Sequence, residues 1–349
     1  MTPRLSVVIV NFHSRTDLER CLPSIARQGV ERVEVIVVDN APGDGSAAWL
    51  EREHPGVIVI ANGANTGYAG GSNLGLRHAS GEHVLVLNPD TELHARALHT
   101  LLQALHEHPD ALITPKLLAP DGSVNACGNQ MHPTGITTCR GLGAPAAAYA
   151  GTHAVPLISG AAFVARRATL LALAGFDERF FMYLEDADLS LRARAQGHAL
   201  LCAADAVVTH HYELAMSAAK LFHLERNRWL MLLKNYERGT LWRLAPALAL
   251  TEVATWAFAL TRGPAYVGAR LRAYGWLWRE RRAWRVARAE TQAARRLSDA
   301  VLLADAPTAL PFEQLVSSPR LARALDTLTT PLYRLVSPRF AVPTSGAQM

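Results

Sequence analysis

At 349 residues, the chain is too long for one ordinary hydrophobic core, which indicates one large domain with an appendage. Half of the residues are hydrophobic and 19% are charged, a globular composition, and the formal net charge is +5. The four cysteines (Cys21, Cys127, Cys139 and Cys202) are far apart and lack metal-ligand spacing, which predicts free thiols in a reducing compartment. The amino terminus has neither the long apolar core nor the cleavage site of a signal peptide, so we expect a cytoplasmic protein.

The first part of the chain alternates strands with helices. Apolar runs predict strands at residues 5–10, 33–38 and 57–60, and helical periodicity predicts helices at 16–28 and 47–53. Strands joined through helices form right-handed βαβ units, so we expect an α/β fold with a parallel sheet. The first strand ends in Asn11 and the second in Asp39 and Asn40.

A glycine-rich segment at residues 62–75 contains five Gly and three Asn. We expect a loop that approaches a ligand closely and leads into a helix at 72–78, whose amino end suits an anion. The segment matches neither the phosphate-loop nor the dinucleotide fingerprint, and a flexible connector is the alternative.

A central strand is predicted at residues 84–87, directly before Asn88, Pro89 and Asp90. Proline has no backbone donor, so it ends the strand and leaves Asp90 at the carboxyl end, where ligands bind in open parallel sheets. The alternative is that Asp90 caps a helix predicted over residues 92–108.

An acidic cluster begins the next informative helix. Glu185, Asp186 and Asp188 follow the apolar residues 180–184, which form an environment that raises a carboxyl pKa toward values suited to a general base. The alternative is that the helix dipole alone favours these acids. Residues 200–211 form a last strand that ends in His210 and His211, either a ligand pair beside Asp90 or two surface histidines.

Residues 119–156 show little periodicity and are expected to form an irregular insertion that borders the site, before a strand at 157–164.

The last third is rich in Arg and Trp. Eight Arg and one acid, Glu280, lie between Arg262 and Arg288, which indicates an anionic surface as partner. Residues 241–261 are apolar but contain Arg243, Pro246 and Glu252, which favours a helix at a membrane interface over a spanning one. Packing on the preceding domain or on a second subunit in a homodimer is the alternative. The sequence has no recognised nucleic-acid module, so we expect no nucleic-acid partner.

Taken in order, six of these motifs resemble glycosyltransferase family 2, especially its rhamnosyltransferase-like branch of cell-envelope polysaccharide enzymes. They are residues 7–11, 37–40, 65–73, 87–91, 185–189, and His210 with 225–228. The resemblance implies a GT-A (Rossmann-like) fold, with a mostly parallel central sheet flanked by helices and a C-terminal α-helical extension. The expected domains are a catalytic domain at 1–236, an amphipathic Arg/Trp-rich helical region at 237–290, and a helical segment with a tail at 291–349.

The resemblance also implies roles for single residues. A nucleotide-diphosphate sugar would lie over the strand ends, with Mn²⁺ or Mg²⁺ held by Asp90 and His210, or by His211 if the register shifts by one. Asn88 stands where the family has the first acid of a D-x-D motif, which leaves one anionic ligand. Asp186 would be the catalytic base, with Glu185 beside it. The implied substrate contacts are Asn11, Asp39, Asn40, Asn65, Gly71, Asn73, Asn88, Asp188 and Arg228.

The expected activity is inverting transfer of a sugar such as rhamnose, from a dTDP- or UDP-linked donor to a lipid-linked or polysaccharide acceptor. The enzyme would work at the cytoplasmic face of the inner membrane. A non-catalytic nucleotide-sugar-binding or scaffold protein is one alternative. A nucleotidyltransferase is another, disfavoured because residues 11–14 are not the basic glycine-rich loop of that class.

Overall fold

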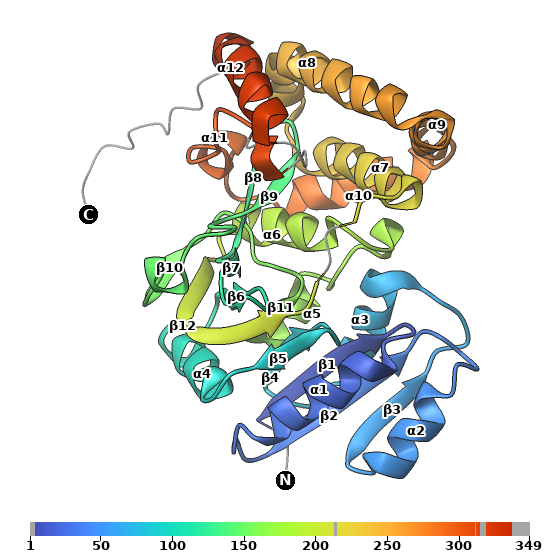
Figure 1. The fold of residues 1–349 in the computed structure, drawn as a ribbon, viewed down its shortest axis with the longest axis vertical. Coiled ribbons are helices and arrows are strands. Elements are labelled where there is room, and N and C mark those ends of the chain that lie inside the picture. The colour runs from blue at the N-terminus through green and yellow to red at the C-terminus, as the bar shows by residue number, and fades with distance from the viewer. Residues whose placement is uncertain (1–3, 213–214, 311, 315–318, 337–349) are drawn as a thin grey trace. The chain divides into compact units, whose positions relative to one another are not determined.

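The computed structural model describes residues 4–212, 215–310, 312–314 and 319–336 (Figure 1). The chain divides into two compact units. The first contains residues 1–129, 139–190 and 198–214, and the second contains residues 130–138, 191–197 and 215–349. These units do not coincide with the predicted boundaries at 236 and 290, and the predicted tail at 343–349 lies outside the described residues.

A central sheet forms the first unit (Figure 1). Its strands are β1 Leu5–Asn11, β2 Val33–Asp39, β3 Val57–Ala61, β4 His83–Leu87, β5 Thr91–Leu93, β6 Leu112–Leu118, β7 Val124–Ala126, β10 Thr152–Ala154, β11 Ala162–Arg166 and β12 Leu200–His210. Their order is β10-β12-β6-β11-β4-β1-β2-β3, with β5 paired to β12 and β7 to β6.

The two halves of this sheet differ in strand direction. Strands β3, β2, β1 and β4 are parallel, and Asn11 lies opposite Asp39 in the register of β1 and β2. In the other half, β11 is antiparallel to β4 and β6, and β10 is antiparallel to β12. The predicted α/β fold is therefore confirmed, with a sheet that is mixed in its second half.

Helices cover the sheet because each buries one apolar face. They are α1 Arg15–Ala26, α2 Ser46–Glu53, α3 Gly67–His78, α4 Ala97–Glu107 and α5 Arg167–Ala172. Leu18 of α1 and Leu98 of α4 lie in one core cluster with Ile9 of β1 and Leu85 of β4. Each of these four side chains is at most 1% exposed.

The helix predicted over residues 92–108 begins later than expected. Thr91 pairs with His210 in the short antiparallel pair of β5 and β12, and α4 starts only at Ala97. Arg96, in the left-handed conformation (φ 65°), separates the two elements. The alternative that Asp90 caps this helix is therefore wrong.

The glycine-rich segment is also more regular than expected. Helix α3 begins at Gly67 and not at residue 72, so four of the five glycines lie inside the helix and Gly63 precedes it. A Cβ atom at Gly71 would lie 2.7 Å from Val10 Cγ1, and one at Gly75 would lie 2.3 Å from Val8 Cγ1. Glycine at these positions lets the helix pack directly on β1, which outweighs its low helix propensity.

Residues 119–156 are not a fully irregular insertion. Strands β7 and β10 extend the sheet, and β8 Asn129–Met131 pairs with β9 Thr137–Cys139. These strands have three residues each, too few to give a periodic signal in the sequence. The strand predicted at 157–164 lies later, at Ala162–Arg166.

Helix α6 (Glu185–Ala195) follows a 3-10 turn at Glu178–Phe180. Its residues 185–190 belong to the first unit and 191–195 to the second. The acidic cluster of the sequence thus lies in the first unit, with the strand ends.

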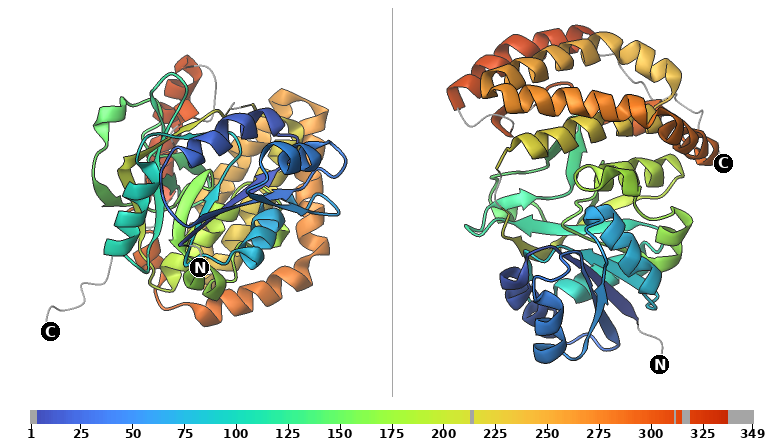
Figure 2. Two further views of the ribbon diagram at one scale, coloured as in Figure 1. Left: turned by 90° about the horizontal axis from the view of Figure 1, so that it is seen from below. Right: turned by 90° about the vertical axis from the view of Figure 1, so that its right-hand side faces the viewer.

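The second unit is mainly helical (Figure 2). Its helices are α7 Ala218–Asn235, α8 Arg238–Arg262, α9 Pro264–Arg279, α10 Arg281–Ala294, α11 Asp299–Leu302 and α12 Pro319–Val336. Helix α9 packs on α7 and α8. Helix α8 is long and apolar enough to cross a membrane by length and composition alone, and 28% of its most apolar window is buried in the protein.

A buried ion network joins α7, α8 and α9. Arg228 and Arg270 are at most 1% exposed. Arg270 Nη1 lies 2.9 Å from Glu225 Oε2, and Arg270 Nη2 lies 2.6 Å from Glu252 Oε2. Arg228 contacts the same two carboxylates. Glu252, which interrupts the apolar run in the sequence, therefore binds two buried cations inside the unit.

Candidate active site

The ends of β1 and β2 bring two predicted donor-binding residues together. Asn11 and Asp39 are both buried, and Asn11 Nδ2 donates to Asp39 Oδ1 at 3.0 Å. The backbone N–H of Ala41 donates to the same oxygen at 3.1 Å. The Asp39 carboxylate is thus held in one orientation at the carboxyl edge of the parallel strands, where this fold class binds ligands.

Asn40 and Asn65 fix the start of α3. Asn40 Nδ2 donates to the carbonyl oxygen of Gly67 at 2.8 Å, and the N–H of Gly67 donates to Asn65 Oδ1 at 2.8 Å. Gly67 has φ 72°, and a Cβ there would lie 2.3 Å from the carbonyl oxygen of Phe181. Only glycine fits both the backbone angle and the contact.

Two other predicted contacts have structural partners. Gly71 faces Val10 and Asn40 in the interface between α3 and β1. Asn73 donates to the carbonyl oxygen of Phe176 at 2.8 Å and accepts from the Phe176 N–H at 2.9 Å. Asn73 therefore fixes the approach to the acidic cluster, and its contact with a donor remains a prediction.

Asp90 lies beside His210 at the end of β12. Asp90 Oδ1 and His210 Nε2 are 3.4 Å apart, and His210 Nδ1 lies 3.1 Å from Asn125 Oδ1. Because Asn125 Oδ1 can only accept, it suits a proton on His210 Nδ1, and the ring turns Nε2 toward Asp90. Tyr212 stacks on the imidazole at 5.3 Å between ring centroids. His211 instead lies near Glu92, with Nε2 3.9 Å from Oε2.

This pair fits a divalent cation. Asp90 Oδ1 and His210 Nε2 are both buried atoms without a well-aligned hydrogen bond, and Asn88 Oδ1 nearby in sequence is a third such atom. A carboxylate oxygen and a neutral imidazole are donors that Mn²⁺ accepts. Burial alone would raise the pKa of Asp90, but its interactions with neighbouring groups, His210 first among them, outweigh burial and lower that pKa. Asp90 is therefore ionised at neutral pH.

Asp186 is held by backbone donors. The N–H of Gly160 donates to Asp186 Oδ2 at 2.8 Å, and the N–H of Ala187 donates to Oδ1 at 2.8 Å. Tyr68 Oη donates to the carbonyl oxygen of Gly160, which fixes that peptide from its other side. Burial raises the pKa of Asp186 although the backbone hydrogen bonds oppose the rise. The result is an oriented carboxylate with increased basicity.

Glu185 and Asp188 flank this group. Glu185 is 6% exposed and its Oε2 is buried without a hydrogen-bond partner. Burial, followed by the charge of Asp186, raises the pKa of Glu185 well above its ordinary value. Asp188 is fully buried.

The phenol of Tyr68 is influenced by Asp90 and by the acidic cluster. Burial raises the pKa of its phenol, and the negative charges of Glu185, Asp186 and Asp90 raise it further. These three carboxylates therefore act electrostatically on one phenol, which belongs to α3.

The backbone before the acidic cluster is strained. Phe181, Tyr183 and Leu184 have φ of 63°, 67° and 65°, in the left-handed region that non-glycine residues avoid. The carbonyl oxygen of Phe181 accepts from the N–H of Ala69 at 3.1 Å, which ties this turn to α3. Such strain costs about 1–3 kcal/mol per residue and is typical of functional sites.

Arg228 belongs to the second unit. Its Nη1 donates to the carbonyl oxygen of Thr134, and its Nη2 contacts Glu225 and Glu252. Its substrate role remains a prediction.

The sequence did not reveal Asn125, Tyr68 or Gly160 as site residues. Asn125 lies in the segment without periodicity, and its role depends on the pairing of β7 with β6. Tyr68 stands inside the glycine-rich motif, and that motif was the feature of the sequence that could have indicated its role.

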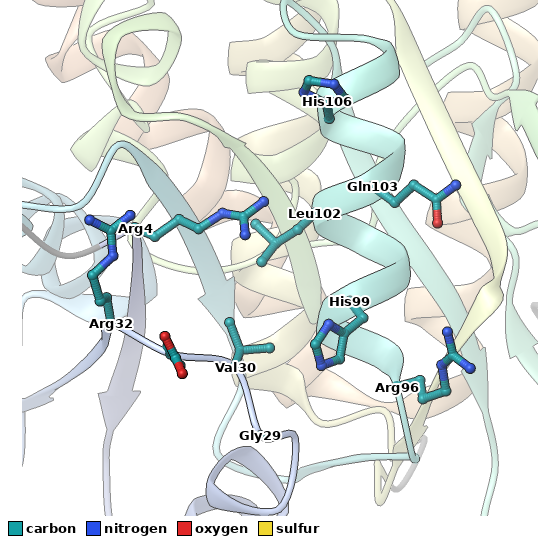
Figure 3. Close-up of a pocket in the computed structure, with 10 residues that line it drawn as sticks. Arg4, Gly29, Val30, Arg32, Arg96, His99, Leu102, Gln103 and His106 are labelled. Carbon is teal, nitrogen blue, oxygen red and sulfur yellow. The ribbon is translucent and has the colours of Figure 1, made fainter.

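A cavity of about 630 Å³ lies elsewhere in the first unit (Figure 3). Basic side chains of Arg4, Arg32, Arg96, His99 and His106 line it. Arg4 precedes β1, so this cavity borders the amino end of that strand and does not include the strand-end residues described above.

Comparison with known proteins identifies the family. Residues 6–170 match the sequence profile described as Glycosyl transferase family 2. Over 236 residues, 60% of this chain and 77% of the relative, the sequence is 31% identical to the N-acetylglucosaminyl-diphospho-decaprenol L-rhamnosyltransferase of Mycobacterium tuberculosis. The chain belongs to glycosyl transferase family 2. The resemblance to its rhamnosyltransferase-like members is confirmed.

A second relative of this glycosyltransferase is the low-salt glycan biosynthesis hexosyltransferase Agl10 of Haloferax volcanii. The two sequences are 31% identical over 207 residues, 56% of this chain and 63% of the relative.

Solved structures of similar fold confirm the GT-A architecture of this family 2 glycosyltransferase. Staphylococcus aureus TarS 1–349 in complex with UDP-GlcNAc has a TM-score of 0.56 and 17% identity, covering 95% of this chain and 90% of that one. The mannosyltransferase PcManGT of Pyrobaculum calidifontis, in complex with GDP-Man and Mn²⁺, has a TM-score of 0.51 and 20% identity, covering 84% and 86%.

Proposed function

We propose that this glycosyltransferase moves a sugar, with rhamnose as the first candidate, from a dTDP- or UDP-linked donor to a lipid-linked glycan acceptor with inversion. The observation that carries the proposal is the Asp186 carboxylate, which is partly buried, oriented by two backbone N–H groups and raised in pKa. The name of the mycobacterial relative supports both the sugar and the acceptor class.

The donor would lie over the ends of β1, β2 and β4. Asp39 is oriented to accept hydrogen bonds from the nucleoside. Asp90 and His210 would hold a divalent cation, and the similar fold of PcManGT in complex with GDP-Man and Mn²⁺ supports this ion class. When bound, such an ion neutralises negative charge that develops on a leaving diphosphate.

The acceptor hydroxyl would meet Asp186 on the other face of the sugar. Its oxygen attacks the anomeric carbon while the bond between that carbon and the diphosphate oxygen breaks. The hydroxyl proton passes to Asp186, and the nucleoside diphosphate leaves with the bonding electron pair. One displacement of this kind inverts the anomeric centre.

We also propose that the second unit meets the membrane surface that presents a lipid-linked acceptor. Trp242 on α8 is 81% exposed and Trp278 on α9 is 69% exposed, and these helices lie side by side (Figure 2). Arg281 lies over the Trp278 ring at 4.5 Å. Exposed Trp with Arg suits the headgroup region of an anionic bilayer.

The first experiment is calorimetric titration of the purified chain with UDP, dTDP and GDP, with and without Mn²⁺ or Mg²⁺. We expect one nucleotide to bind in a metal-dependent way, and Asp90→Ala to abolish that dependence. Transfer from the corresponding nucleotide sugar to a polyprenyl-diphosphate-GlcNAc acceptor would then establish the reaction. A folded chain that binds no nucleotide would instead favour the non-catalytic scaffold alternative.

A separate experiment tests the membrane. We expect the chain to sediment with phosphatidylglycerol vesicles, and Trp242→Ser with Trp278→Ser to reduce the bound fraction. Equal binding to neutral phosphatidylcholine vesicles would contradict a role for the arginines.

A further inference from the structure

Two cysteines and a histidine that are distant in the sequence meet in the first unit. Cys127 follows β7, His153 is in β10, and Cys202 is in β12. Cys127 Sγ lies 3.2 Å from Cys202 Sγ and 3.7 Å from His153 Nε2. All three ligand atoms lie within 4.8 Å of one another. We propose that these residues bind a zinc ion, at a site distinct from Asp90 and His210.

The backbone positions all three side chains. His153 and Cys202 are direct partners in the antiparallel pair of β10 and β12, so their side chains lie on one face of the sheet. The N–H of Cys127 donates to the carbonyl oxygen of Arg140 at 2.8 Å, and the Arg140 Nη1 donates to the carbonyl oxygen of Cys127 at 3.3 Å. The ligands are therefore fixed by sheet pairing and a backbone clamp.

The ligand types suit zinc. Cysteine sulfur and histidine nitrogen are the usual protein ligands of this ion, which binds them as thiolate and neutral imidazole.

The distances favour a metal over a disulfide. With Zn–S bonds of about 2.3 Å and Zn–N bonds of about 2.1 Å, a tetrahedral ion separates two sulfurs by about 3.8 Å and sulfur from nitrogen by about 3.6 Å. The distance between Cys127 and His153 already fits, and the sulfurs at 3.2 Å need to separate by about 0.6 Å. A disulfide would need them to approach by about 1.1 Å instead.

The three proposed ligands differ in exposure. Cys127 and Cys202 are fully buried, whereas His153 is partly exposed. An ion can enter past the imidazole, and water can complete its coordination. The expected ion is exchangeable, because three protein ligands and a water form a more open site than four protein ligands.

Zinc at this site would stabilise the sheet. Cys127 and Cys202 are 75 residues apart in the chain, and a ligand that binds the folded state alone raises its stability. We expect the midpoint of thermal unfolding of the full chain to rise by about 5 °C or more in saturating Zn²⁺.

The test measures metal binding directly. The full chain, reduced and stripped with a chelator, is titrated with Zn²⁺ and separately with Co²⁺. We expect one ion per chain at the cysteine site, besides any ion that Asp90 and His210 bind, and for Co²⁺ a thiolate-to-metal charge-transfer absorption that Zn²⁺ displaces. Cys202→Ser and His153→Gln should each weaken binding at least 10-fold, and the charge-transfer intensity should fall in the cysteine variant alone.

Controls separate this site from the others. Cys139→Ser keeps all three proposed ligands and should bind like the unaltered chain. Asp90→Ala should leave the cobalt absorption unchanged, because its metal would have oxygen and nitrogen ligands. The proposal is overturned if no thiolate band appears, if Cys139→Ser loses it, or if mass analysis finds Cys127 and Cys202 joined in a disulfide under mild reduction. His153→Gln changes a partly exposed residue, so it keeps the test decisive even if the buried cysteine variant does not fold.

Discussion

Partly buried carboxylates occur in both units, but their surroundings differ. In the second unit, Glu252 contacts Arg228, Arg270 and Tyr274, and the arginine charges lower its pKa against the opposing effect of burial. In the first unit, Asp186 has backbone N–H partners, and burial raises its pKa. A buried acid paired with arginine remains ionised and fixes helices in place. One held by neutral donors can accept a proton.

Removing the proposed base should have the largest effect. Asp186→Asn keeps the shape of the side chain but not its basicity, so the transfer rate should fall by about 10²–10⁴-fold. Calorimetry should show donor binding unchanged.

The pH dependence of the unaltered enzyme sharpens this prediction. Because burial raises the pKa of Asp186 above its ordinary 3.8, the rate should decline as the pH falls through that raised value, where the base becomes protonated. If Asp186→Asn transfers the sugar at a rate within 10-fold of the unaltered enzyme, Asp186 is excluded as the base.

Breaking the buried ion network of the second unit should lower the free energy of unfolding. Arg270→Met leaves Glu225 and Glu252 with one arginine, and removal of one partner from a buried ion pair costs about 3–5 kcal/mol. Denaturant unfolding monitored by Trp fluorescence measures the loss. The matched control is Arg272→Met on the exposed face of α9, with an expected effect within about 0.5 kcal/mol. Equal effects of the two variants would show that the network contributes nothing specific.

Substitution of Asn125 tests the pairing of Asp90 with His210 in the first unit. Asn125→Leu removes the acceptor that orients His210, so the Mn²⁺ concentration for half-maximal nucleotide binding should rise about 10–100-fold. Asn125→Asp keeps an acceptor oxygen and should retain tighter metal binding than the Leu variant. The same metal requirement in both variants would contradict the positioning role.

Glu185→Gln should stabilise the folded chain at neutral pH. The folded-state pKa of Glu185 is raised above 4.5, so its stabilising contribution is complete below pH 4.5 and is lost as the pH rises through the folded value. Gln cannot ionise, so the variant avoids this loss of stability. The loss amounts to about 1.4 kcal/mol for each pH unit by which the folded-state pKa of Glu185 exceeds its unfolded-state pKa. Thermal unfolding from pH 4 to 8 measures it. A variant less stable than the unaltered chain at pH 8 would contradict the prediction.

The sequence predicted the strand-end residues because each follows an apolar run that only a buried strand explains. Asn11, Asp39 and Asp90 all lie where those runs end. It did not predict the helical start of α3, because glycine has a low helix propensity that packing against Val8 and Val10 overrides.

Long-range pairing was also beyond the sequence. Asn125 meets His210, and Cys127 meets Cys202, only because β7, β6 and β12 are neighbours in the sheet. The spacing of the cysteines along the chain contains no trace of that arrangement.

The left-handed turn before Glu185 sets a limit on improving this enzyme. Glycine at Tyr183 or Leu184 would relieve the backbone penalty, yet the freed turn would hold Asp186 less firmly. Selection for thermostability alone would therefore favour substitutions that slow turnover. The three left-handed residues are where stability and activity trade against each other in this chain.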